Sequence, residues 1–324
     1  MGGVPVCRRG AGLPSEQDLA DGGAGECVVD AGRRGRLGMG VISIAVPAID
    51  RWYFMEIVRG AEQRTRAHGH EPRLHRVELS DDSTAVATAT IREDFVENDS
   101  IGAVVAGFRY RAGVQTVETS WARPIVLVGG SALGFPTVMI DDLTAARSAT
   151  EHLRGLGHTR IAHFTASMEH QAGHLILRRR AKGYRLAMEA GGLEPVVIEH
   201  GLDQTSAREV ARRVLQGVSR PTAVFAVTDD IAIGVLEAAR GFDLQPGRDL
   251  SVVGFNDQPE ALAADLTTVR IRPAEMGAAA IDMLLSGLTP ELDPTRSHLH
   301  PSSLITRGST GPALAPVNRN SMAS

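Results

Sequence analysis

Short apolar runs alternate with amphipathic stretches from Met39 onward, and this alternation predicts the order of strands and helices. Most of the runs are continuously apolar and rich in β-branched residues, which is typical of parallel strands that are buried on both faces. The expected strands lie at residues 41–46, 101–105, 125–128, 138–140, 160–164, 196–198, 223–227 and 251–255.

Helical periodicity fills the intervals between these runs. Phe54, Ile57, Val58 and Ala61 follow the i, i+3, i+4, i+7 spacing of a helix that ends near Gly69. Further helices are expected at residues 143–156, 205–217, 229–240 and 273–286, the first of them with Asp141 and Asp142 placed to cap it. This regular alternation predicts a doubly wound α/β fold, and its strands fit two parallel sheets better than one.

Residues 1–38 lack this periodicity and hold 10 of the 35 glycines, which predicts a flexible tail. Cys7 and Cys27 both lie there, so the body is expected to hold no disulfide or Cys-ligated metal. No apolar run reaches the roughly 18 residues of a membrane span. No secretory signal is visible either, which predicts a cytoplasmic protein without a membrane partner. The net charge of -4 leaves only local contacts with nucleic acid.

No catalytic signature is present, and we expect neither an enzyme nor a bound cofactor. The chain has no G-x-S-x-G, H-E-x-x-H or P-loop phrase, and no G-x-G-x-x-G follows the first strand. His163, His170 and His174 are the nearest approach to a metal cluster, and their spacing favours ordinary loop and helix positions over a metal site.

Polar and aromatic residues follow several of the expected strands, where open α/β sheets bind their ligands. Trp52 and Tyr53 come after the first strand, and either could stack on a sugar or purine ring or simply pack, whereas Phe54 is expected in the core. Arg180 opens a helix beside other cations that form a solvated face, and its fork of donors suits ligand hydroxyl or carboxylate groups.

Two further strands end in groups that can accept or donate hydrogen bonds. Thr228 and Asp229 follow the run AVFAV, and Asn256 follows SVVGF. Such residues either contact a ligand or cap the next helix. We expect Asn256 to contact a ligand and Asp229 to cap a helix.

Five phrases occur in register along the chain: HLRGLGHTRIA at 152–162, RAKGY at 180–184, PTAVFAVTDDIAIG at 221–234, DLSVVGFND at 249–257 and LTTVR at 266–270. In sequence and spacing they resemble the effector-binding core of the LacI/GalR family of bacterial transcriptional regulators. The resemblance runs from about Met39 to Arg307.

The resemblance implies a periplasmic-binding-protein-like type I fold of two subdomains joined by three crossovers. One subdomain would comprise residues 39–139 and 273–298, and the other residues 140–269 and 299–307, with residues 308–324 as a tail. A small sugar-like or nucleoside-like effector would bind between them. The implied ligand-binding positions are Trp52, Tyr53, Arg180, Asp203, Thr228 and Asn256.

The family resemblance also implies a homodimer whose arrangement responds to the effector. Residues 1–38 do not match the family's helix-turn-helix headpiece, and only AGRRGRLGMGVI at 31–42 is similar to its hinge. Arg33, Arg34 and Arg36 could touch DNA phosphates or belong to a linker. Operator DNA is therefore expected as a partner only where a headpiece exists.

The alternative is a solute-binding protein of a transport or sensing system, which would share the fold and the cleft. The phrase LGHTRIA resembles regulators more than transport proteins. Replacing Arg180 with alanine is expected to abolish effector binding and to leave the stability of the ligand-free protein nearly unchanged.

Overall fold

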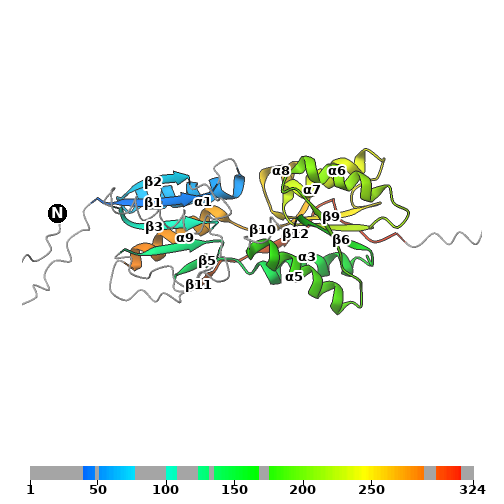
Figure 1. Ribbon diagram of the computed structural model, residues 1–324, viewed down its shortest axis with the longest axis horizontal. Helices are drawn as coiled ribbons and strands as arrows, with labels where there is room; N and C mark the ends of the chain where they lie inside the picture. The colour runs from blue at the N-terminus through cyan, green and yellow to red at the C-terminus, as the bar shows by residue number, and fades with distance from the viewer. Residues whose placement is uncertain are drawn as a thin grey trace, which may run out of the picture. The chain divides into compact units, whose positions relative to one another are not determined.

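The computed structural model describes residues 39–47, 51–76, 100–107, 123–130, 135–167, 175–287 and 297–314 (Figure 1). All of them belong to one compact unit that begins at Met39. Several residues considered above lie outside the described ranges: Cys7, Cys27, Arg33, Arg34, Arg36, His170 and His174.

The first sheet is parallel throughout its described strands, in the order β11-β5-β4-β3-β1-β2. Its strands are β1 (Val41–Val46), β2 (Glu71–Arg76), β3 (Ser100–Ala106), β4 (Ile125–Val128), β5 (Thr137–Met139) and β11 (Ser297–Leu299). Helices α1 (Trp52–Ala67) and α9 (Pro273–Ser286) pack against each other and against this sheet. A Cβ atom at Gly60 or Gly277 would overlap backbone atoms of the opposite helix, so glycine permits the two helices to approach closely.

The second sheet has the order β12-β10-β9-β8-β6-β7. Its strands are β6 (Ile161–Ala166), β7 (Val196–His200), β8 (Ala223–Ala226), β9 (Ser251–Asn256), β10 (Thr267–Arg270) and β12 (Ser303–Ile305). The strands pair in parallel except at the β10–β12 edge, which is antiparallel. Helix α3 (Asp142–Gly155) packs on α5 (Leu175–Ala190), α6 (Gln204–Leu215) packs on α7 (Asp229–Arg240), and the short α8 (Pro259–Ala263) contacts α7.

The two sheets have the same strand order. Positions β2, β1, β3, β4, β5 and β11 of the first sheet correspond to β7, β6, β8, β9, β10 and β12 of the second. The described chain passes between the sheets three times, from β5 to α3, from β10 to α9, and from β11 to β12.

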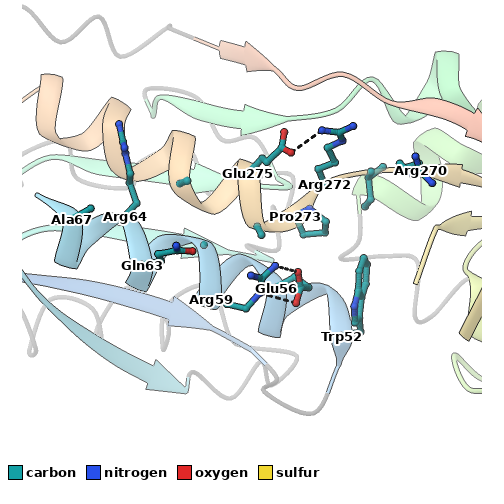
Figure 2. Close-up of a pocket in the computed structure, with 14 residues that line it drawn as sticks. Trp52, Glu56, Arg59, Gln63, Arg64, Ala67, Arg270, Arg272, Pro273 and Glu275 are labelled. Atoms are coloured by element: carbon teal, nitrogen blue, oxygen red, sulfur yellow. Dashed lines mark hydrogen bonds and ion pairs between the residues drawn. The ribbon is translucent and has the colours of Figure 1, made fainter. Parts of the chain in front are cut away.

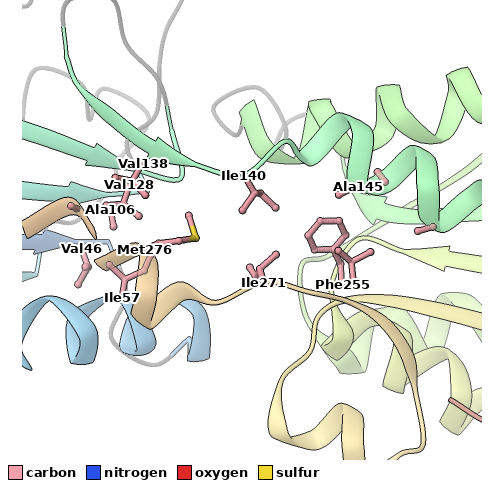
Figure 3. Close-up of a cluster of buried hydrophobic side chains, with 14 of the residues drawn as sticks. Val46, Ile57, Ala106, Val128, Val138, Ile140, Ala145, Phe255, Ile271 and Met276 are labelled. Atoms are coloured by element: carbon pink, nitrogen blue, oxygen red, sulfur yellow. The ribbon is translucent and has the colours of Figure 1, made fainter. Parts of the chain in front are cut away.

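The largest buried apolar cluster includes side chains from both sheets (Figure 3). Val46 and Met276 belong to the part around the first sheet, and Phe255 to the part around the second. Ile140 and Ile271, on two of the connecting segments, are buried at 4% exposure each and belong to the same cluster. A second cluster lies beneath α6 and α7 and includes Phe164, Ile231 and Leu236.

The predicted fold class is confirmed, since the protein is an α/β structure with two largely parallel sheets. Every expected strand is present, with ends that differ by at most two residues. The pattern missed β2, β10, β11 and β12. Strand β2 reads EPRLHR and lies at a sheet edge with no fully buried residue, so it lacks the apolar run by which the others were found.

The segment at residues 308–314 differs from the expected tail. Ser309 is 1% exposed, and its hydroxyl donates to the carbonyl of Val252 at 2.6 Å and accepts the N–H of Thr267 at 2.8 Å. The backbone N–H of Ala313 donates to the carbonyl of Leu156. These bonds hold the segment to the second sheet.

Candidate functional site

Arg180 lies at the carboxyl edge of the second sheet and is almost fully buried. Its side chain extends from α5 and is 4% exposed. Nε donates to Asp142 Oδ1 at 2.8 Å, and Nη1 donates to the carbonyl of Val227 at 2.7 Å. Val227 directly follows β8, so these two bonds hold the guanidinium at the end of that strand.

The guanidinium also stacks on an aromatic ring. The Cζ of Arg180 lies 3.5 Å from the ring centroid of Phe255, within the range of a cation–π contact. Phe255 belongs to β9 and immediately precedes Asn256. The expected ligand residues Arg180, Thr228 and Asn256 are therefore brought to one edge of one sheet, because each lies at or beside the end of β8 or β9.

Asn256 ends β9 with an unusual backbone conformation. Its φ is 122° and that of Asp257 is 60°, a region that non-glycine residues seldom adopt. Asn256 is 6% exposed, and its carbonyl accepts the N–H of Ile271 on the connection to α9. Its side-chain amide has no hydrogen-bond partner among the described residues. Strained conformations of this kind often occur at functional sites.

Tyr53 is placed by the first turn of α1 and is electrostatically close to Arg180. A Cβ atom at Gly129 would overlap the Tyr53 hydroxyl, so the phenol packs directly on that glycine. Burial raises the pKa of Tyr53, the Asp142 carboxylate raises it further, and Arg180 opposes the shift. The phenol therefore stays protonated, and it can donate a hydrogen bond.

The remaining expected ligand residues have different surroundings. Thr228 is the N-cap residue of α7, but its side chain makes no capping bond. Asp203 is exposed and caps α6 by accepting the N–H of Ser206 at 2.8 Å. Trp52 begins α1 and lines an open groove. Phe54, which the pattern placed in the core, is partly buried and packs against the large cluster.

The groove beside Trp52 has a volume of about 690 Å³ and runs between α1 and α9 (Figure 2). Its lining includes four arginines, and each is paired with a carboxylate. Arg59 pairs with Glu56, Arg64 with Asp282, Arg270 with Asp257 and Arg272 with Glu275. The charges along this groove are therefore largely balanced.

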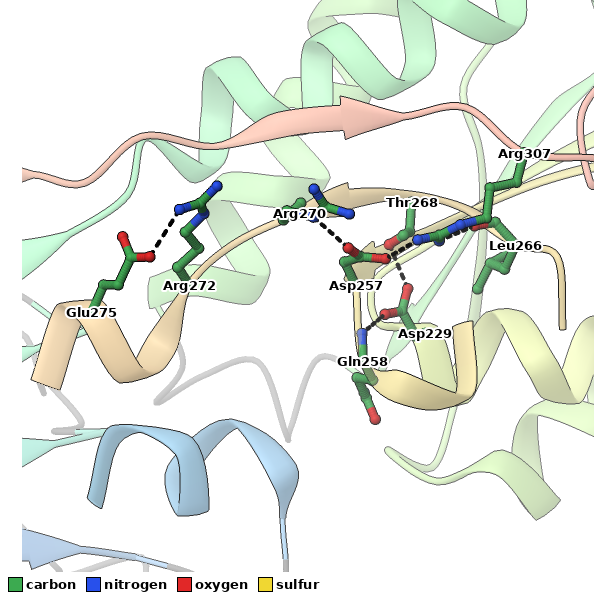
Figure 4. Close-up of polar contacts among 9 residues, drawn as sticks. All are labelled: Asp229, Asp257, Gln258, Leu266, Thr268, Arg270, Arg272, Glu275 and Arg307. Carbon is green, nitrogen blue, oxygen red and sulfur yellow. Dashed lines mark hydrogen bonds and ion pairs between the residues drawn. The ribbon is translucent and has the colours of Figure 1, made fainter. Parts of the chain in front are cut away.

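Asp229 does not cap α7, and the expectation that it would is wrong. Its Oδ2 accepts the N–H of Gln258 at 2.8 Å, and its Oδ1 accepts the hydroxyl of Thr268 at 2.5 Å (Figure 4). Asp229 is fully buried, and this burial raises its pKa to about 6. The carboxylate faces inward because Asp229, at the start of α7, lies against Gly254 of β9. Its two hydrogen bonds connect the start of α7 to β10 and to the residue before α8, and they do not cap α7.

Asp257 is held between two arginines next to this network. Its Oδ2 accepts Nε of Arg270 at 2.5 Å, and its Oδ1 accepts Nη2 of Arg307 at 2.6 Å (Figure 4). Arg307 also donates to the carbonyl of Leu266 at 2.7 Å. These two ion pairs connect Asp257 to β10 and to the segment that follows β12.

His163 lies in β6 as a core residue, whereas the sequence favoured a loop or helix position for it. It is 0% exposed, lies between the rings of Tyr184 and Phe225, and hydrogen-bonds the carbonyl of Phe225 through Nδ1. Burial lowers its pKa to about 3. Within the part of the chain that the structure describes, no three His, Cys, Asp or Glu residues are grouped as metal ligands.

Comparison with known proteins places this architecture in a family. Residues 150–310 match a periplasmic binding protein-like domain. The chain is 31% identical over 277 residues to the HTH-type transcriptional repressor CytR of Escherichia coli strain K12, an alignment that covers 83% of this chain and 79% of that protein. The chain belongs to the LacI family of transcriptional regulators.

Other LacI-family proteins are also similar to this chain in sequence or in fold. The ribose operon repressor of Escherichia coli strain K12 is 29% identical over 279 residues, covering 83% of this chain and 81% of the repressor. The crystal structure of the lac repressor dimer bound to operator and the anti-inducer ONPF has the same fold, with a TM-score of 0.75 and 21% identity. It matches 85% of this chain and 95% of that one.

The predicted regulatory function is thereby confirmed over the transport alternative, since these LacI-family relatives are transcriptional repressors. None of the helices in the described ranges has the length and apolar character needed to cross a membrane.

Sequence reasoning missed the contact of Asp142 with Arg180, because Asp142 was considered only as a helix cap. Asp141 is the residue that caps α3, by accepting the N–H of Thr144 at 3.1 Å and its hydroxyl at 2.6 Å. The pair of consecutive carboxylates before one helix was the available signal, since one side chain is sufficient for the cap.

Proposed function

We propose that this LacI-family regulator is a repressor that responds to a small sugar-like or nucleoside-like effector bound around Arg180. The observation that supports the proposal is the buried Arg180 at the end of β8. Its Nη2 has no hydrogen-bond partner among the described residues. A rigid donor at this position can bind a hydroxyl or carbonyl of a ligand.

Neighbouring groups supply complementary chemistry. The side chains of Asn256 and Thr228 and the phenol of Tyr53 make no hydrogen bonds to other described residues. Together they offer hydroxyl and amide groups that both donate and accept. One solved LacI-family regulator, from Enterococcus faecium, carries bound ribose, and a ligand of that size and polarity suits such a set. Trp52 and Asp203 remain proposed ligand residues at the margin of this site.

The proposal includes a homodimer whose arrangement responds to the effector. Met55 on α1 is 55% exposed and Leu74 on β2 is 41% exposed, and the two elements pack against each other. Exposed large apolar side chains on adjoining elements are typical of an interface. The lac repressor, which shares this fold, has been solved as a dimer.

Operator DNA is a proposed partner of this regulator only where a DNA-binding headpiece precedes β1. Arg33, Arg34 and Arg36 lie in the segment that would join such a unit to β1. The two subdomains proposed from the sequence would transmit effector binding through the three connections between the sheets.

A thermal-shift screen tests the effector proposal. The full chain is heated with individual neutral sugars and nucleosides, because a ligand that binds only the native state raises Tm. Arg180→Lys keeps the charge but loses the planar fork, and we expect it to abolish most of the shift. Arg179→Lys, one position earlier on α5, is the matched control and should keep the shift. Absence of any shift, or equal loss in both variants, would contradict the proposal.

A further inference from the structure

We propose that Asp142 positions Arg180 and neutralises its charge, so that the site accepts uncharged effectors and rejects phosphorylated or carboxylated ones. This inference rests on the effector site proposed above, and it adds the chemical class that the site selects. It assigns a specificity role to a residue that the sequence presented only as a possible helix cap.

The contact between the two side chains carries the inference. The Arg180 Nε to Asp142 Oδ1 distance is 2.8 Å, and both side chains are 5% exposed. A charge-assisted bond of this length between groups shielded from water compensates the guanidinium directly. Because Nη1 is held by the carbonyl of Val227, the orientation of the fork is fixed from two sides.

A second observation shows that Asp142 is not needed for the helix that it begins. Asp141 accepts both the N–H and the hydroxyl of Thr144, and it is therefore the residue that caps α3. The Asp142 carboxylate instead faces the second sheet's edge, where its Oδ1 accepts from Arg180. A carboxylate buried at a helix start without a capping role needs another function to offset its desolvation.

The other charges at this edge are also balanced. Arg270 and Arg307 share Asp257, and the buried Asp229 lies within electrostatic reach of Asp257. Asp230 adds a further carboxylate, which accepts the side-chain N–H of Gln258 at 3.3 Å. The three guanidinium groups around the residues that follow β8 and β9 are therefore matched by at least as many carboxylates. Thr228, Asn256 and Tyr53 add no charge.

This balance determines what can bind. A phosphate or carboxylate entering the site would lose its hydration and find no uncompensated cation, which is strongly unfavourable. A hydroxyl or carbonyl group loses far less, and it can accept from Arg180 Nη2 without displacing Asp142. The same arginine without its carboxylate would instead be a typical anion ligand.

The test compares Asp142→Asn with Asp141→Asn in the full chain. Both substitutions remove one negative charge from the start of α3, but only the first leaves Arg180 uncompensated. Each protein and the wild type are titrated calorimetrically with inorganic phosphate, against sodium chloride of equal ionic strength. Phosphate bound at the α1–α9 groove would contribute equally in all three proteins.

We expect Asp142→Asn to bind phosphate at least about tenfold more tightly than Asp141→Asn, which should match the wild type. Equal phosphate affinity in the two variants would overturn the inference. Asp142→Ser is the second variant if the asparagine protein does not fold.

A wild-type measurement keeps the inference falsifiable without any variant. Thermal shifts are compared for ribose against ribose 5-phosphate and for adenosine against adenosine monophosphate. A larger shift from either phosphorylated compound would overturn the inference. If the whole neutral panel fails to bind while Asp142→Asn still gains phosphate affinity, the proposed effector class is wrong but the charge compensation stands.

Discussion

Gly254 of β9 lies directly against the buried carboxylate of Asp229. A Cβ atom at Gly254 would overlap Asp229 Oδ1 and would also lie 2.9 Å from a methyl carbon of Leu266. The strand can therefore carry only glycine here while Asp229 keeps its bonds to Gln258 and Thr268.

Gly254→Ala should destabilise the protein by about 1–3 kcal/mol, because the added methyl group must displace the carboxylate or shift the strand. The measurement is the free energy of unfolding from urea titration. Gly155→Ala is the control, since a Cβ atom at that helical position meets nothing within 4 Å. That variant should be neutral or slightly stabilised. Equal effects at the two positions would contradict this account.

Asp229 makes stability depend on pH in a specific direction. Its pKa is raised to about 6 in the folded protein from an ordinary value of 3.8, mainly by burial. The folded state thus binds this proton more tightly than the unfolded state. The contribution of the protonated group is fully present below pH 4 and is lost as the pH rises to about 6, by roughly 3 kcal/mol in total.

Asp229→Asn should remove this dependence. The amide oxygen can accept from Gln258, and the amide N–H₂ can donate to the Thr268 hydroxyl, so the packing is retained. Denaturation of both proteins between pH 4 and 7 should show a smaller decline in stability with rising pH for the variant. Parallel curves for the two proteins would show that Asp229 does not titrate in this range.

The structure changes the expectation for Arg180→Ala. The sequence suggested that the ligand-free protein would keep its stability, but the substitution leaves Asp142 buried without its partner. Breaking a buried ion pair from one side typically destabilises by about 3–5 kcal/mol. We therefore expect large losses of unfolding free energy for Arg180→Ala and Asp142→Ala alone. Additive effects in the double variant would contradict a direct pair, since coupling should make its loss clearly smaller than the sum.

The proposed dimer interface is tested by introducing a charge at Met55. Met55→Glu places a carboxylate on the exposed face of α1 and should shift the protein toward monomer in analytical ultracentrifugation. Leu262→Glu provides the control, because Leu262 is 70% exposed but lies on α8, beside the second sheet. A wild-type protein that sediments as a monomer at micromolar concentration would rule out this interface.

The apolar pattern located the strands that are continuously apolar, such as β1, because such runs are typical of parallel strands buried on both faces. It could not locate β10, in which two of the four residues are buried threonines. Their hydroxyl groups are satisfied by distant partners, Thr267 by Arg307 and Thr268 by Asp229. Sequence spacing contains no information about such partners.

The same limit applied to the candidate site. Arg180 was selected from its fork of donors and from the family resemblance. The strand-end rule pointed to Asn256, because the ends of neighbouring parallel strands meet at one edge. It could not distinguish Asp141 from Asp142, or show that Asp229 would turn inward. Those outcomes depend on which atoms the fold brings within hydrogen-bonding distance, and a single residue along the chain separates a surface cap from a buried ion pair.

Because β11 and β12 are edge strands of the two sheets and both lie within residues 297–305, neither sheet is complete until the ribosome has passed this segment. During translation both sheets would leave the ribosome with an unpaired edge at β5 and β10. A stop codon shortly before residue 297 would remove one strand from each sheet. No single cut in the gene could release either half as an intact piece.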